Sequence, residues 1–358
     1  MAPLPHRRIL PTRCANCGAA THRHLVGALL PKPGESRRVH HDRSRAVRRP
    51  QRTETGPMTV RAPLPDDLRD REFTVAAAAA AGVSAKRLRA SDLVAPTSGV
   101  RMPRAAGIRE RRRAVLLAVR ADAFLCGVSA AQEHGLPMPW RLRDTVEVGV
   151  PWPARAPRRS GVVARSLRIT GDEVECRGIR LTSPARTFCD LAPRLSVPEL
   201  VAVADAIPPW VDLSRAAAEH PGARFRGKLA TAVAARDCFR ESPAESEMFA
   251  LILLAGLPRP TPQVVIADRG RFIARVDGLF EPYGEVLEYQ GDHHRTDLRQ
   301  WRRDRTREAE LEALGFHVTE VTQADLREPR AFVERLAASL RRRGWTGSVR
   351  YSRWFPEG

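Results

Sequence analysis

The chain has 358 residues, 43% of them apolar, and this length predicts two or three domains with ordinary buried cores. Its net charge of +19 comes almost wholly from arginine, which favours binding to a polyanion such as nucleic acid, although GC-rich coding gives the same arginine bias. Short apolar runs, the absence of a visible secretory signal and six irregularly spaced cysteines exclude a membrane span and a disulfide framework, so the chain is expected to be cytoplasmic.

The first 57 residues differ in composition from the rest. They contain twelve Lys and Arg but three acids, with scattered prolines and no periodic apolar pattern. Such a segment cannot bury enough surface to offset its ordering entropy, so residues 1–60 are expected to form a disordered basic extension. Cys14 and Cys17, with His22 and His24, suggest a zinc knuckle, but the fourth ligand is missing at the usual spacing. Met58 begins a stretch typical of a natural start, so a mis-called extension is the other interpretation.

Residues 61–102 have the pattern of a small winged helix-turn-helix. The expected elements are a first helix at 64–71, a second at 75–81 capped by Thr74 and ended by Gly82, a third at 85–90 capped by Ser84, and a wing at 93–102. In the third helix Lys86, Arg87 and Arg89 are placed to reach phosphates or guanine edges of DNA. A solvated pair of helices would have the same pattern.

Residues 103–213 predict a mixed α/β middle domain. Its expected elements are a basic helix at 108–120, a short helix that opens at Ser129 and stops near Gly135, strands at 145–150 and 161–165 joined by a proline-rich loop, and a helix that begins after Ser183. A linker helix is expected within residues 214–239.

Residues 240–345 predict a C-terminal α/β domain, followed by a tail at 346–358. Ser242 begins a helix in a capping box with Glu245, so the role of Glu245 could be limited to binding backbone donors. Strands are expected at 261–266, 272–279, 286–290 and 317–322, and helices at 298–314 and 329–342. In the first of these helices Asp304 and Arg307 have the i, i+3 spacing of a surface ion pair.

Two acids are expected to meet across a β-hairpin in this domain. The turn is centred on Pro282 and Tyr283, and symmetric pairing of Phe280 with Glu285 places Asp277 opposite Glu288. Like charges directly opposed on a sheet are destabilising, so such a pair indicates a cation. The period of two puts Gln290 on the same face as Glu288.

This block resembles the PD-(D/E)XK nucleases, and more specifically the Vsr-like endonuclease family known as domain of unknown function 559. The matching residues are Ser242 to Glu245, Arg275-Val276-Asp277, the run Glu288-Tyr289-Gln290-Gly291-Asp292-His293-His294-Arg295, Asp304 with Arg307, and Gly315-Phe316-His317-Val318. The resemblance implies a mixed four-stranded sheet flanked by helices. This chain departs from the family at Gln290, where the family usually has Asp.

The same resemblance implies a metal-dependent DNA endonuclease. Asp277 and Glu288, with Glu245 as a third carboxylate, would bind Mg²⁺ or Mn²⁺, which suits oxygen ligands. Gln290 would orient the attacking water, His294 would assist proton transfer, and the nucleic acid backbone would be held by Arg295, Arg299, Arg302, Arg303 and Arg307.

Residues 61–213 resemble the AbiEi-like type IV antitoxins, which act as repressors. The resemblance is carried by the winged-helix pattern and by SAAxxHGLP and GIRLTSPARTxxDLA in the middle domain. It implies the alternative of a non-catalytic DNA-binding regulator with a degenerate nuclease fold and a toxin partner. DNA and RNA both stay open as substrates, and the sequence contains no signal for the oligomeric state.

Overall fold

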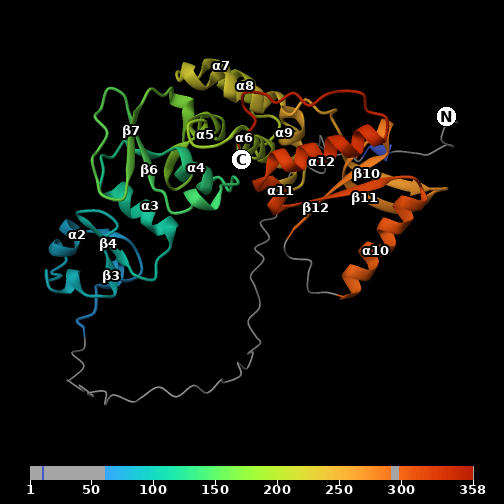
Figure 1. The fold of residues 1–358 in the computed structure, drawn as a ribbon. Coiled ribbons are helices and arrows are strands. Elements are labelled where there is room, and N and C mark those ends of the chain that lie inside the picture. Colours follow the sequence, from blue (N-terminus) through green and yellow to red (C-terminus); the bar gives the residue numbers. More distant parts are fainter. Residues whose placement is uncertain (1–9, 12–60, 292–297, 358) are drawn as a thin grey trace, which may run out of the picture.

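The computed structural model describes residues 10–11, 61–291 and 298–357, and for residues 10–11 and 298–304 it describes the backbone alone. The protein is mixed α/β, with three sheets and helices packed on them (Figure 1). In the described part of the chain, none of the helices has the length and apolar composition needed to cross a membrane. The motif Cys14 to His24, and His293, His294 and Arg295, lie outside the described residues.

The N-terminal unit is built on a small three-stranded sheet in the order β2-β4-β3. Its elements are α1 (Asp66–Arg69), β2 (Phe73–Thr74), α2 (Val75–Ala80), the 3-10 turn η1 (Arg87–Arg89), β3 (Leu93–Val94) and β4 (Val100–Pro103). Thr74 caps α2 as expected, since its hydroxyl accepts a hydrogen bond from the Ala77 N–H. Gly82 follows with φ +78°, a left-handed conformation suited to glycine at a helix end.

The third helix expected at 85–90 is wrong, because this segment forms only one 3-10 turn. Ser84 does cap it, by accepting a hydrogen bond from the Arg87 N–H. Arg101 then donates from Nε to the Leu88 carbonyl at 2.8 Å, which supplies this carbonyl with a partner outside a helix. The expected wing is a hairpin of β3 and β4, and its turn lies against the middle region, where Arg159 donates to the Ser98 carbonyl.

The middle region contains a five-stranded sheet in the order β7-β6-β5-β9-β8. Its strands are β5 (Phe124–Leu125), β6 (Glu147–Pro151), β7 (Val163–Leu167), β8 (Val174–Cys176) and β9 (Arg180–Thr182). The helices that accompany it are α3 (Ile108–Leu117), α4 (Gly127–Glu133), α5 (Pro184–Leu191), α6 (Val197–Ala206), α7 (Leu213–Glu219) and α8 (Arg226–Ala234). Helix α4 begins at Gly127, two residues before the expected start, and α5 begins after its Ser183 cap as expected.

The C-terminal region has the element order α9-β10-β11-β12-α10-β13-α11-α12. The bounds are α9 (Pro243–Leu254), β10 (Thr261–Asp268), β11 (Arg271–Phe280), β12 (Glu285–Gln290), α10 (Leu298–Ala313), β13 (His317–Thr322), α11 (Gln323–Arg327) and α12 (Pro329–Arg342). Strands β10, β11 and β12 are antiparallel, and β13 runs parallel to β12 because α10 carries the chain back across the sheet.

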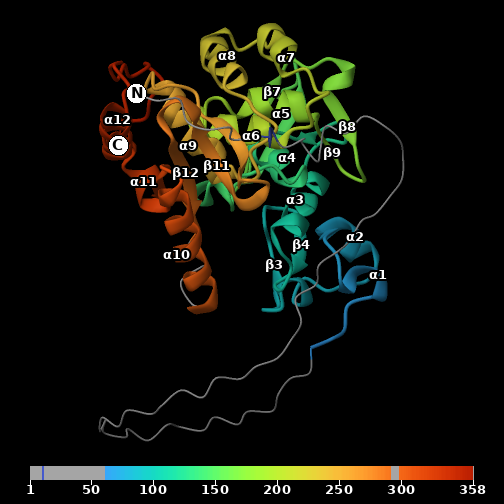
Figure 2. The ribbon, with the colours of Figure 1, turned by 90° about the vertical axis from the view of Figure 1, so that its right-hand side faces the viewer.

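The sheet has five strands instead of the expected four. The additional strand β1 (Leu10–Pro11) pairs with the edge of β10, and the sequence pattern contains no signal for it. One face of the sheet packs against α9 and α12 through residues such as Phe249, Leu287 and Phe332. The other face packs against α10 through Leu311. Figures 1 and 2 agree that α10 and the N-terminal unit project from the same side of the molecule.

Candidate functional site

The hairpin of β11 and β12 has the expected register near its turn. Phe280 pairs with Glu285, and Gly284 adopts φ +57° at the end of the turn. The ladder ends at Gly278 and Leu287, one step before Asp277 would pair with Glu288. Instead of a ladder bond, the Tyr289 N–H donates to Oδ2 of Asp277 at 2.8 Å. The carboxylate of Asp277 therefore replaces a backbone acceptor between the two strands.

Strand β11 loses its alternation at Asp277. Val276 and Leu279 are three residues apart and yet pack in the same apolar cluster, whereas strict alternation would place them on opposite faces. A Cβ at Gly278 would lie 2.9 Å from the ring of Phe249 on α9, so the strand approaches that helix closely here. The ladder stops at this break, so the predicted pairing of Asp277 with Glu288 stays a prediction.

Glu245 and Asp277 are brought together by Gln263 of β10. The Gln263 side-chain amide donates to Oε2 of Glu245 at 2.9 Å and lies 3.4 Å from Oδ1 of Asp277. Gln263 has φ +50° and is 4% exposed, and no sequence signal marked it. The three residues come from α9, β10 and β11, so the fold assembles this acidic pair from distant segments.

Both acids of this pair have raised pKa values. Burial is the main cause for Glu245, and the negative charge of Asp277 adds to it. Burial also raises the pKa of Asp277, while the hydrogen bonds from Tyr289 and Gln263 oppose the shift. A cation between two such carboxylates would favour their charged forms and reverse the shift.

The N-terminus of α9 is held beside β11 by its own polar contacts. Ser242 accepts from the Glu245 N–H at 3.2 Å, and the Glu245 carboxylate accepts from the Glu241 N–H at 3.0 Å. Arg275 forms a two-point ion pair with Glu241 at 2.7 and 2.8 Å. Glu245 therefore binds a backbone donor and also faces Asp277. Its two expected roles, binding a backbone donor and binding a metal ion, are compatible.

Glu288 has a different partner. Arg307 of α10 donates to its Oε2 at 2.6 Å, in an ion pair whose side chains are 33% and 11% exposed. The expected pair of Arg307 with Asp304 stays a prediction, because the Asp304 side chain is not described. Gln290 donates to Glu320 of β13 at 3.3 Å, and Glu320 lies beside Glu288 in the parallel ladder. Glu320 is a neighbour that the motif did not include.

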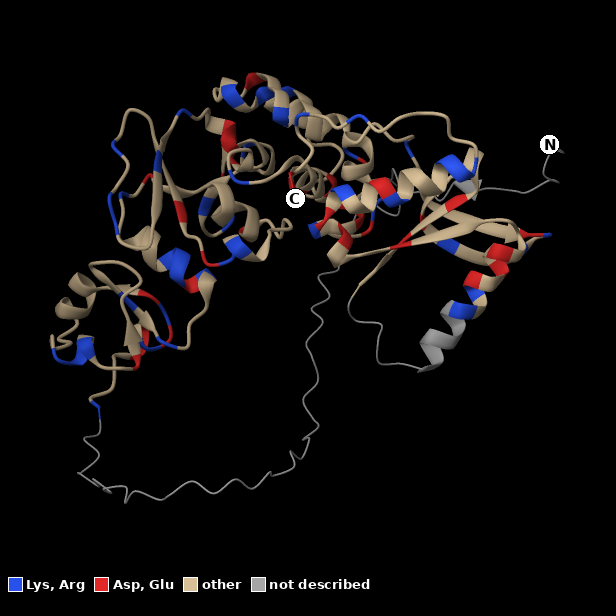
Figure 3. Ribbon diagram, in the orientation of Figure 1, with Lys and Arg blue, Asp and Glu red and all other residues tan. Residues whose placement is uncertain are grey.

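The donor set is entirely carboxylate oxygen, which suits Mg²⁺. Within the described ranges, no group of three or more His, Cys, Asp or Glu side chains lies close enough to hold a metal ion. Glu245 and Asp277 converge on the Gln263 amide, and Glu288 forms an ion pair with Arg307. The backbone of α10 also carries Arg299, Arg302 and Arg303, whose side chains are not described. Figure 3 shows that the part of α10 that follows them carries blue residues first and red residues nearer its end.

Of the predicted nucleic-acid residues in the N-terminal unit, Lys86 and Arg89 are exposed. Arg87 has fewer donors left for a phosphate, because its guanidinium binds the Ala62 carbonyl and both oxygens of Asp92.

Two proteins of Mycobacterium tuberculosis are similar to this chain. They are the uncharacterized protein MT2308 of strain CDC 1551 / Oshkosh and the uncharacterized protein Rv2248 of strain H37Rv. Each is 31% identical over 215 residues, which cover 58% of this chain and 73% of the relative. No family model matches the chain. No solved structure matches it either.

Proposed function

Because the chain belongs to the same family as these two uncharacterized mycobacterial proteins, whose names state no activity, we propose a function from its own residues: metal-dependent hydrolysis of nucleic acid phosphodiester bonds. The observation that carries this proposal is the pair Glu245 and Asp277, a buried and a partly buried carboxylate from distant segments that share the Gln263 amide. Burying like charges together is unfavourable, so an arrangement of this kind is expected where a cation binds.

The topology supports the same proposal. A helix, three antiparallel strands, a second helix and a parallel strand follow one another in the order α9-β10-β11-β12-α10-β13, with the acids on α9, β11 and β12. This is the arrangement expected from the resemblance to PD-(D/E)XK and Vsr-like endonucleases.

The proposed roles follow from chemistry and position. Glu245 and Asp277 would bind Mg²⁺ or Mn²⁺, with Glu288 as the third candidate ligand. The ion, when bound, would polarise the phosphate and lower the pKa of a water molecule. Gln290 would orient that water, and Arg307, now paired with Glu288, would neutralise a phosphate oxygen. His294 would assist proton transfer, a role for a residue outside the described part.

A second function, a DNA-binding regulator of antitoxin type with a toxin partner, has its own supporting observation. Arg307 neutralises Glu288, which suits a site that does not bind a metal ion. The small sheet with its β3-β4 hairpin would then carry the function as a winged helix-turn-helix. The two proposals differ in one measurable property, which is cleavage.

The test is nicking of supercoiled plasmid in Mg²⁺ or Mn²⁺, with wild type compared with Glu288→Ala and Asp277→Asn. Loss of a metal ligand removes several kcal/mol of transition-state stabilisation, so both variants are expected to nick at least about 100-fold more slowly. Glu312→Ala, an exposed acid on α10, is the matched control and should keep wild-type activity. Equal nicking by wild type and both site variants, with operator binding retained, rules out the enzyme and leaves the regulator.

A further inference from the structure

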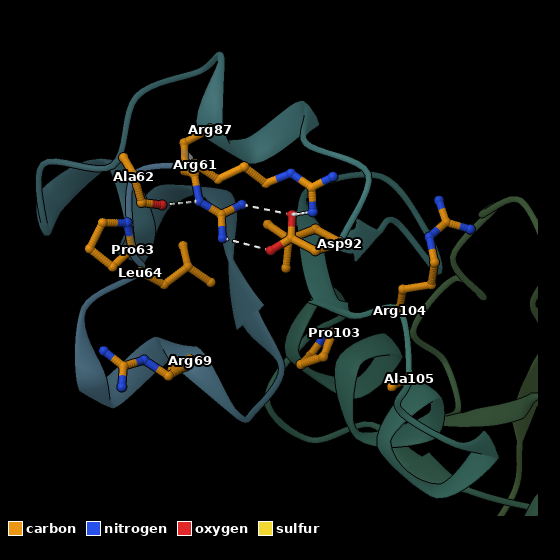
Figure 4. Close-up of a pocket in the computed structure, with 11 residues that line it drawn as sticks. Arg61, Ala62, Pro63, Leu64, Arg69, Arg87, Asp92, Pro103, Arg104 and Ala105 are labelled. Carbon is orange, nitrogen blue, oxygen red and sulfur yellow. Dashed lines mark hydrogen bonds and ion pairs between the residues drawn. The ribbon is translucent and has the colours of Figure 1, made fainter. Parts of the chain in front are cut away.

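The N-terminal unit contains a pocket of about 620 Å³ that the proposed catalytic site does not use. It lies between the segment that enters the unit, α1, the turn after η1 and the end of β4. We call it the arginine pocket, and its lining residues with side-chain charge are Arg61, Arg69, Arg87, Asp92 and Arg104. Four cations and one acid therefore line the pocket. Figure 4 shows Arg61 and Arg87 directed at Asp92, with Arg69 and Arg104 standing to either side.

The innermost arginine and the acid are already matched. Arg87 donates to the two oxygens of Asp92 at 3.0 and 2.7 Å, and its Nε donates to the Ala62 carbonyl. The hydrogen bond from Arg87 is the largest cause of the lowered pKa of Asp92. The charges of Arg87 and Asp92 cancel, and their hydrogen bonds hold one wall of the pocket in place. The net positive charge of the pocket therefore comes from the other three arginines.

Those three arginines keep unused hydrogen-bond donors. Arg104 is exposed and uses Nε to bind the Ser91 carbonyl, and in the described part of the chain its two terminal nitrogens form no hydrogen bond. Arg61 donates to the Ser91 hydroxyl and lies 3.7 Å from Asp92. Arg69 pairs with Asp66 of its own helix, and both side chains are largely exposed, so that contact is weak.

The floor between the arginines is apolar. It is formed by Leu64 and Leu93, which are buried, together with Pro63, Pro103 and Ala105. A ligand that fits must therefore combine an anionic group with a less polar body. A nucleic acid backbone has this combination, because each phosphate is flanked by sugars, and guanidinium groups bind phosphate oxygens with good geometry.

We propose that the arginine pocket binds an internal backbone phosphate of the nucleic acid and anchors it away from the acidic site. The turn that carries Lys86 and Arg89 is short, and the hairpin turn near Ser98 is bound to Arg159, so neither offers a comparable cluster. The pocket and α10 belong to elements that project from the same side of the molecule (Figures 1 and 2). This inference rests on the proposed function in its choice of ligand.

The test is fluorescence anisotropy of a labelled DNA duplex and the matching single strand with the full chain, in EDTA and without added metal. Arg104→Ala, Arg69→Ala and the double variant are compared with Arg71→Ala, an exposed arginine of the same unit that does not line the pocket. Each single pocket variant is expected to bind roughly fivefold more weakly and to reduce the salt slope by about one, because one phosphate contact is lost, and the double variant is expected to lose more. Arg71→Ala should match wild type.

Two results would overturn the proposal. One is that the pocket variants bind as Arg71→Ala does, within a factor of about two on the scale set by such contacts. The other is that adenosine monophosphate binds wild type but not Arg104→Ala and leaves DNA binding unchanged, which assigns the pocket to free phosphate monoesters. EDTA prevents metal-dependent cleavage, so failure here is separate from failure of the nicking test. Circular dichroism of each variant verifies the fold.

Discussion

Gln263 contacts a buried and a partly buried carboxylate at once. Its amide donates to Glu245 and lies within reach of Asp277, and its own side chain is almost fully buried. The pattern of β10 contains no feature that distinguishes Gln263 from an ordinary strand residue. Its backbone conformation, with φ +50°, is set by the fold around it, so a contact of this kind is found only in three dimensions.

Gln263→Leu removes this donor and leaves the two acids facing each other. The free energy of unfolding is expected to fall by about 1–3 kcal/mol, the usual range for a buried polar group that loses its partner. Urea denaturation measures it, and a double-mutant cycle with Asp277→Asn isolates the coupling. The loss of unfolding free energy caused by Gln263→Leu should be smaller when residue 277 is Asn. It should also be smaller in the otherwise wild-type chain when Mg²⁺ is present. Equal costs in both backgrounds would show that Gln263 does not act through the acid pair.

The contact between α6 and α9 joins the middle and C-terminal regions and contains an acid with a shifted pKa. Burial and the nearby charge of Glu199 raise the pKa of Glu247 to about 7, and Arg141 opposes the shift. Glu199 is itself bound to Arg141 at 2.9 Å and caps α6 through Ser196. Glu247 therefore has to lose its proton against both burial and a neighbouring carboxylate.

A raised pKa means that the fold prefers the neutral acid. The stability that Glu247 contributes is complete below its usual pKa near 4.5 and is lost as the pH rises through about 7. Glu247→Gln should therefore be more stable than wild type at pH 8, by a difference on the order of 3 kcal/mol, which shrinks toward pH 5. Guanidinium denaturation at both values measures it. Glu219→Gln, an exposed acid on α7, should show no such trend.

At the scale of elements, local signals located most of the C-terminal region. The period of two and the capping residues gave β13 and α12 their observed bounds, and the turn at Gly284 gave the pairing of Phe280 with Glu285. The prediction of a third helix in the N-terminal unit was wrong. A Ser cap followed by good helix formers does not reveal that the Leu88 carbonyl accepts a hydrogen bond from the Arg101 side chain. The break in the alternation of β11 at Asp277 could not be predicted, because it depends on the close approach of α9 to Gly278.

Across the whole molecule, the middle and C-terminal regions share one apolar core. The cluster runs from Val128 of α4 to Phe355 near the C-terminus and includes residues of α5, α6, α8, α9 and α12. The boundaries expected at residues 213 and 240 therefore fall inside a continuously packed stretch. The expected tail is also part of it, since Arg350 and Ser352 donate backbone hydrogen bonds to Ala255 and Leu254. Composition shifts cannot reveal that two predicted domains pack together.

A buried ion pair crosses this junction and provides a test. Arg240 donates to Asp205 of α6 at 2.8 Å, and its guanidinium lies over the ring of Phe249 at 4.8 Å. Asp205→Ala leaves Arg240 buried without its counter-charge, so unfolding should become easier by about 3–5 kcal/mol. A calorimetric scan should show one transition for both regions in wild type. Two separated transitions in wild type would contradict a shared core.

The course of α9 through this shared core determines how the acidic pair can be isolated for study. Glu245 lies in the first turn of α9, while the same helix packs against α6 along its length. A fragment that starts near residue 240 would leave that flank of α9 in water, so it would tend to self-associate and to lose the geometry at its first turn. Any activity of the acids thus depends on the preceding half of the polypeptide, even though that half contributes no residue to the acidic pair.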